Sequence, residues 1–120
     1  RVQEFFGGLG EAAISALTEV EFYSALSRRV RMNELSEKTA LAVISQFRSH
    51  ADAGLYRVVS VERRDYLLAR DWLMSFATGL RTLDAIHLAV ASSNGFHFVT
   101  ADRRLASAAK ALDVRHTLIS

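Results

Sequence analysis

The sequence predicts one α/β domain of three layers, in which helices flank a mostly parallel central sheet. Short apolar runs rich in strand-forming residues alternate along the chain with longer segments whose apolar positions follow the helical period. A length of 120 residues is enough for one buried core and too short for two. We therefore expect a single domain whose strands are joined by right-handed crossovers.

The first elements are predicted from glycines, capping residues and apolar runs. Residues 2–6 precede a glycine pair, which favours a short helix that ends there. Residues 11–15 are mostly apolar and follow Gly10, which is typical of a buried strand. Thr18 is a good N-cap residue, so a helix should begin at Thr18 and end at the arginines of residues 28–31.

The remaining residues predict further helices in alternation with strands. Ser36 opens a helix with a clear 3.6-residue period, and a later helix should carry Tyr66, Leu73 and Phe76 on its buried side. The apolar stretch around Asp84 should form a largely buried helix. The predicted helices span residues 36–54, 62–79, 80–91 and 102–112, and the predicted strands span residues 56–61, 96–100 and 114–119.

The composition narrows the class of protein. Hydrophobic residues make up 50% of the chain and charged residues 23%, which is typical of a folded domain. The absence of cysteine excludes a disulfide framework and a thiolate zinc site, and it fits a reducing compartment such as the cytoplasm. Charged residues interrupt every apolar stretch before it is long enough to span a bilayer, so no membrane association is expected.

The basic residues are almost all arginines, whose planar side chains suit phosphates and carboxylates. They cluster at residues 28–31, 63–64 and 103–104, which could form a phosphate-facing surface if the fold gathers them. For any one pair, a solvated helix face is the more common explanation.

Three acidic residues stand where parallel strands end. Glu21 lies one turn into the helix after the first predicted strand, and Asp102 follows the strand that ends at Thr100. Asp84 lies near the start of the apolar helix that leads into that strand. Function gathers at the carboxyl ends of such strands, and carboxylates that meet there repel one another unless they share a hard metal ion. The sequence therefore predicts a Mg²⁺ or Mn²⁺ site.

Each acid also has an ordinary explanation. Glu21 completes a capping box with Thr18, and Asp102 suits an N-cap. Asp84 is harder to explain this way, because an unpaired carboxylate is costly in so apolar a neighbourhood. The other acids considered are expected to be solvated: Glu19, Asp65, Asp71 and Asp113.

Three segments together resemble the ordered acidic motifs of PIN domains, and their spacing is similar to that of the VapC-like toxins of type II toxin–antitoxin systems. They are ISALTEVEF at residues 14–22, LRTLDAIHLA at residues 80–89 and FVTADRRL at residues 98–105. The resemblance implies a PIN-like fold and an endoribonuclease that uses Mg²⁺ or Mn²⁺ to hydrolyse phosphodiester bonds.

Carried over by position, the resemblance makes Glu21, Asp84 and Asp102 the catalytic and metal-binding acids, with Thr100 as a supporting polar residue. His87 lies three residues after Asp84 and could help to orient that acid. A hydrogen-bonded core histidine is the more common explanation for such a residue.

The resemblance further implies an RNA substrate, a cognate antitoxin and a homodimer. The candidate RNA contacts are Arg28, Arg29, Arg81 and Arg103. The candidate interface side chains, for which core packing is the default, are Tyr23, Leu26, Trp72, Met74 and Phe76. The alternative function is a catalytically inactive PIN-like module that binds RNA or protein. A receiver or nucleotide-binding domain is disfavoured, because no glycine-rich phosphate loop is present and no lysine follows the last strand.

The sequence departs from the family at its start. PIN domains begin with a strand that ends in an acidic site residue and is followed by a helix, and we expect residues 1–120 to be a single PIN-like domain without that first strand and helix. Arg1 in place of an initiating methionine fits a trimmed chain. The strand would occupy the middle of the sheet, so its loss should prevent the usual pairing and leave a large apolar slot.

Overall fold

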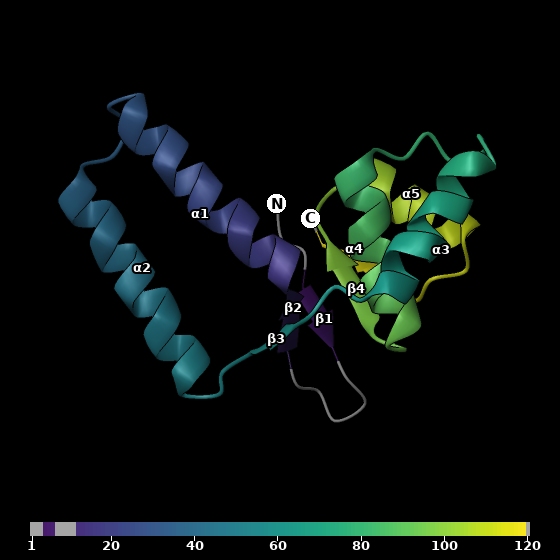
Figure 1. The fold of residues 1–120 in the computed structure, drawn as a ribbon, viewed down its shortest axis with the longest axis horizontal. Helices are drawn as coiled ribbons and strands as arrows, with labels where there is room; N and C mark the ends of the chain where they lie inside the picture. The colour runs from purple at the N-terminus through teal and green to yellow at the C-terminus, as the bar shows by residue number, and fades with distance from the viewer. Residues whose placement is uncertain (1–3, 7–11, 120) are drawn as a thin grey trace.

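The chain folds as the α/β domain that the sequence predicts (Figure 1). The computed structural model describes residues 4–6 and 12–119. No helix of these residues is long and apolar enough to cross a membrane. The helices are α1 (Ala16–Arg31), α2 (Glu37–Asp52), α3 (Arg63–Met74), α4 (Thr82–Ser93) and α5 (Arg103–Ala111). The strands are β1 (Glu4–Phe6), β2 (Ala12–Ser15), β3 (Arg57–Val59), β4 (His97–Thr100) and β5 (His116–Leu118).

The five described strands form one sheet in the order β3-β2-β1-β4-β5. β2 pairs with β3, and β4 with β5, in parallel, whereas β1 runs antiparallel to both of its neighbours. Phe5 is in register with Ala13 on one side and with Phe98 on the other. The central position that the sequence was expected to leave empty is therefore occupied by β1.

The predicted helix at residues 2–6 is wrong for the part that the structure describes, since Glu4–Phe6 is a strand. Aromatic residues favour strands, and hydrogen bonds to a neighbouring strand on each side outweigh the local signal from the glycine pair. Gly7 and Gly8 themselves lie outside the described residues.

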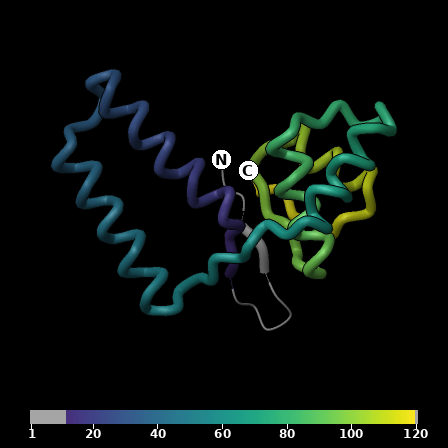
Figure 2. Tube along the Cα trace, in the orientation of Figure 1, coloured from purple at the N-terminus to yellow at the C-terminus, as the bar shows by residue number. Residues whose placement is uncertain are grey.

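Helices α1 and α2 form a hairpin that stands apart from the other three helices, as the trace shows (Figure 2). Ser15, not Thr18, is the N-cap of α1, because its hydroxyl accepts a hydrogen bond from the backbone N–H of Thr18. Ser36 caps α2 in the same way, as predicted, and Gly54 follows that helix with a φ of 79°.

Aromatic side chains of this hairpin pack against Tyr56, the residue just before β3. The rings of Phe22 and Phe47 lie 4.9 Å apart, and those of Phe47 and Tyr56 lie 5.3 Å apart. The Tyr56 hydroxyl donates to the Phe47 carbonyl over 2.8 Å. Burial raises the pKa of Tyr56, with smaller contributions from Tyr23 and Glu19. The folded state therefore disfavours the charged phenolate, so the fold loses stability as the pH rises through the raised pKa.

Helix α3 ends earlier than its pattern predicts. Ser75 ends it, and its hydroxyl donates to the Trp72 carbonyl over 2.6 Å. Phe76 then adopts a left-handed φ of 58° and is 93% exposed, and Tyr66 within α3 is 53% exposed, so the predicted place of these two residues on the buried side of a helix is wrong. A helical period alone cannot show that a serine hydroxyl will end the helix before the last apolar residues.

The core lies around α4, which is buried from Asp84 to Ala91. This helix packs on α3 and on β4, and α5 packs on β4 and β5. Phe98 and Leu105 contribute large buried side chains from β4 and α5. The start of α4 and the residues just after β4, which carry two of the predicted acids, therefore border the most buried part of the described chain.

Candidate active site at the start of α4

His87 and Glu21 join α4 to α1. The distance from His87 Nε2 to Glu21 Oε1 is 2.7 Å, while His87 is fully buried and the Glu21 side chain is 35% exposed. The capping box that was considered for Glu21 is wrong, because Ser15 takes the N-cap position and the Glu21 carboxylate reaches across to α4 instead. One carboxylate oxygen of Glu21 is thus held by a hydrogen bond to a side chain of the buried helix α4.

The other ring nitrogen of His87 faces hydroxyl groups. Its Nδ1 lies 3.3 Å from Ser15 Oγ and 3.4 Å from Thr18 Oγ1. These two hydroxyls lie 3.2 Å from each other. Both nitrogens of the buried ring therefore have partners, which confirms the expectation of a hydrogen-bonded core histidine. His87 also forms a direct hydrogen bond with Glu21, a partner that the sequence did not predict.

Asp84 occupies the first turn of α4 and is only 8% exposed, as its apolar neighbourhood predicts. A carboxylate there is favoured by the positive end of the helix dipole. Asp84 also lines a hollow of about 480 Å³ together with Gly79 and residues of α5 that include Arg104. This acid therefore lies between two helix starts, at the edge of solvent.

Asp102 is the N-cap of α5, as one of the two interpretations of the sequence predicts. Its Oδ1 accepts hydrogen bonds from the backbone N–H groups of Arg104 and Leu105, over 2.9 Å and 3.3 Å. Thr100 is fully buried, and its hydroxyl accepts from the Asp102 N–H over 3.1 Å. Thr100 therefore supports the backbone at the point where Asp102 leaves the strand.

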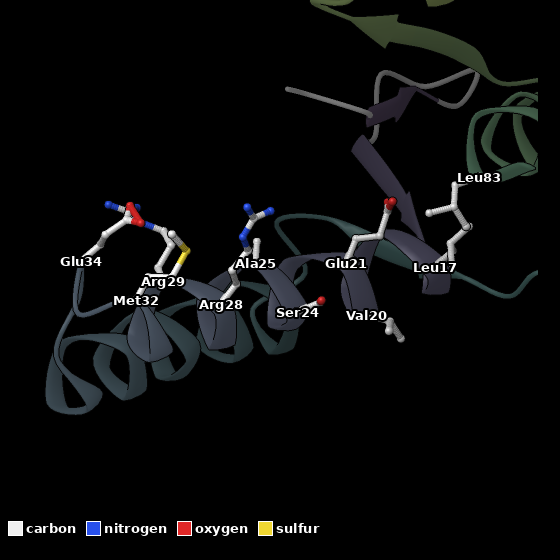
Figure 3. Close-up of a pocket in the computed structure, with 10 residues that line it drawn as sticks. All are labelled: Leu17, Val20, Glu21, Ser24, Ala25, Arg28, Arg29, Met32, Glu34 and Leu83. Atoms are coloured by element: carbon white, nitrogen blue, oxygen red, sulfur yellow. The ribbon is translucent and has the colours of Figure 1, made fainter. Parts of the chain in front are cut away.

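A hollow of about 700 Å³ runs along α1 (Figure 3). Glu21 lines it with Arg28 and Arg29, and Figure 3 shows Glu21 and Arg28 projecting from the same side of the helix. Of the predicted RNA contacts, these two arginines share a hollow with a predicted acid. Arg81, at the N-cap of α4, and Arg103, at the start of α5, are exposed but do not line this hollow.

The model of the PIN domain family matches residues 1–111. The chain belongs to the PIN domain family. No curated protein and no solved structure matches it. PIN domains are generally nucleases and typically use divalent metal ions. The match confirms the resemblance to PIN domains at the level of the family.

The described part of this PIN domain does not gather a complete metal site. Carboxylate oxygens are the ligands that Mg²⁺ and Mn²⁺ prefer, and three candidate acids lie near the carboxyl end of the sheet. Nevertheless, no three potential ligand side chains among the described residues come close enough to hold one ion. Glu21 is engaged by His87, and Asp102 caps a helix.

Sequence reasoning missed one buried acid of this PIN domain. Asp65 was expected to be solvated, but it is fully buried. Its Oδ2 accepts from the Glu62 N–H over 2.8 Å, whereas its Oδ1 has no hydrogen-bond partner and lies 4.0 Å from the Arg64 Nε. The spacing of Glu62 and Asp65 is that of a capping box at a helix start, and this signal could have identified Asp65.

Proposed function

We propose that this PIN domain is a metal-dependent endoribonuclease that hydrolyses phosphodiester bonds in RNA. The observation that carries the proposal is the hollow along α1, where the half-exposed Glu21 shares one surface with Arg28 and Arg29. Guanidinium groups bind phosphates, and a carboxylate beside a bound phosphate can take part in its hydrolysis as a metal ligand or as a base. The general nuclease role of the family supports the same conclusion.

The spacing of these residues fits a single RNA strand. Arg28 lies seven positions after Glu21, which on an α-helix is about two turns on the same face and about 10 Å along the axis. A phosphate at Arg28 and a second phosphate near Glu21 would therefore belong to one strand that follows α1. Both arginines are exposed, so their side chains can meet a ligand without repacking the core.

Replacing Arg28 and Arg29 together by alanine should weaken RNA binding and flatten its dependence on salt. Each lost phosphate contact removes a released counterion, so the slope of log K against log salt should fall by about 1.4 for a single strand. Fluorescence anisotropy with a short labelled RNA at several salt concentrations measures this slope. The matched control is Arg48→Ala on the exposed surface of α2, away from the hollow. Equal slopes for the double variant and the control would exclude the hollow as the RNA path.

The proposal keeps Glu21, Asp84 and Asp102 as the acids of the site and Mg²⁺ or Mn²⁺ as the cofactor. A calorimetric titration with Mn²⁺ should give saturable binding that is lost in Asp84→Asn.

The alternative function is an inactive PIN-like module that binds RNA or protein. It is favoured by the hydrogen bonds that already engage Glu21 and Asp102. Absence of Mn²⁺ binding to the wild-type chain would select that alternative.

We also propose that the protein is the toxin of a type II toxin–antitoxin pair and forms a homodimer. What supports a protein interface is apolar exposure: Met74 is 62% exposed and Phe76 is 93% exposed beside an apolar hollow of about 420 Å³. Of the other candidates, Leu26 is buried, and Tyr23 and Trp72 are half-buried, so core packing accounts for these three. A monomer at every concentration in sedimentation velocity would count against the homodimer.

A further inference from the structure

We infer that His87 is a positioning residue, which holds the Glu21 carboxylate in one orientation at the edge of the hollow along α1. The inference rests on the proposed function in one respect, namely that Glu21 takes part in RNA cleavage. His87 is fully buried, so it does not contact RNA itself. Its effect on the reaction would pass through Glu21.

The first support is the hydrogen bond between the two residues. At 2.7 Å, the contact from His87 Nε2 to Glu21 Oε1 has the length of a charge-assisted hydrogen bond. Glu21 lies on α1 at the rim of the domain, whereas His87 lies on the most deeply buried helix. A long, flexible glutamate side chain is thereby fixed to a rigid element, which is how positioning residues act on the groups that they serve.

The second support is the arrangement of hydroxyls at the other ring nitrogen. Ser15 Oγ already accepts the N–H of Thr18, so its own hydrogen is free to point toward the Nδ1 of His87 or toward Thr18 Oγ1. Thr18 Oγ1 offers Nδ1 a second donor. With Nδ1 as an acceptor, the neutral ring carries its hydrogen on Nε2 and donates it to Glu21. The carboxylate can only accept, so it selects the tautomer with hydrogen on Nε2, and both hydroxyls can donate to Nδ1 in that tautomer.

The contacts that run from Ser15 through His87 to Glu21 resemble those of a nucleophilic triad, but the burial of Ser15 excludes that role. Ser15 is fully buried, and its hydroxyl caps α1. It therefore cannot reach a substrate, and the chain of contacts ends at Glu21, the one member that borders the hollow.

A pair of neutral variants separates positioning from core packing. In His87→Gln, the side-chain amide reaches about as far as Nε2 and can still donate to Glu21. In His87→Asn, the shorter amide reaches only as far as Nδ1 and leaves Glu21 without its donor. We expect the Gln variant to stay within about 10-fold of wild-type RNA cleavage and the Asn variant to lose about 100-fold. Equal cleavage by two variants of equal melting temperature would overturn the inference.

A measurement on the unreacted protein keeps the inference testable if a variant fails to fold. In nitrogen-15 NMR of the wild-type chain, the His87 ring should show a protonated Nε2 and an unprotonated Nδ1. The Nε2 proton signal should shift in Glu21→Gln and not in the control Glu19→Gln. A proton on Nδ1 alone, or no shift in Glu21→Gln, would overturn the inference. Absence of RNA cleavage by the wild-type protein would instead reject the proposed function, and the NMR result would stand independently.

Discussion

Asp84→Asn should lower RNA cleavage by about 100- to 1,000-fold while the domain stays folded. The substitution removes a full negative charge from a site that is only 8% exposed, where electrostatic interactions are stronger than in water. The shape of the side chain hardly changes. The carboxylate lies in the first turn of α4, where the helix dipole favours a negative charge by about 0.3–1 kcal/mol.

The measurement is the initial rate of cleavage of a labelled RNA, with the melting temperature of each protein recorded beside it. Asp113→Asn provides the control, since this residue is exposed and has a φ of 60°, a left-handed conformation that asparagine tolerates well. The control should cleave RNA at the wild-type rate. An Asp84→Asn protein that also does so would remove Asp84 from the site.

Phe98→Ala should destabilise the domain by about 3–5 kcal/mol. Phe98 is fully buried in β4 and belongs to the cluster that surrounds α4, so its removal would leave a large cavity beside the site. Domains of this size have a free energy of unfolding of about 5–15 kcal/mol, and the variant would therefore lose a large share of it. Because β4 ends at Thr100, RNA cleavage should fall together with stability.

Urea unfolding followed by circular dichroism measures the change in the free energy of unfolding. Leu118→Ala in β5 is the matched control, since Leu118 is 43% exposed and its truncation should cost less than about 1 kcal/mol. A small loss for Phe98→Ala, equal to that of the control, would mean that the core does not lie around α4 and β4.

Most elements could be predicted from the sequence because their signals are local. Ser36 and Gly54 bracket α2, and Asp102 caps α5, as their residue types favour. The apolar composition of residues 84–91 predicts the buried helix α4. Each of these predictions depends on residues within one or two helical turns of one another, where the physical preferences are strongest.

The rest depends on contacts between distant residues. β1 is a strand because β2 and β4 hydrogen-bond to it, and nothing within Glu4–Phe6 specifies those partners. Likewise, the partner of Glu21 lies 66 positions away on α4, so the local capping-box pattern pointed to the wrong contact. The order of acidic motifs along the chain identified the family, but side-chain pairing within the site required the fold.

The nuclease proposal is tested most directly by incubating the wild-type chain with a labelled single-stranded RNA in the presence of Mn²⁺ and, in parallel, with excess chelator. It predicts internal cleavage of the RNA with Mn²⁺ and none with the chelator. Intact RNA under both conditions, from a chain shown to be folded, would contradict the nuclease proposal. Equal cleavage under both conditions would contradict its dependence on a metal ion.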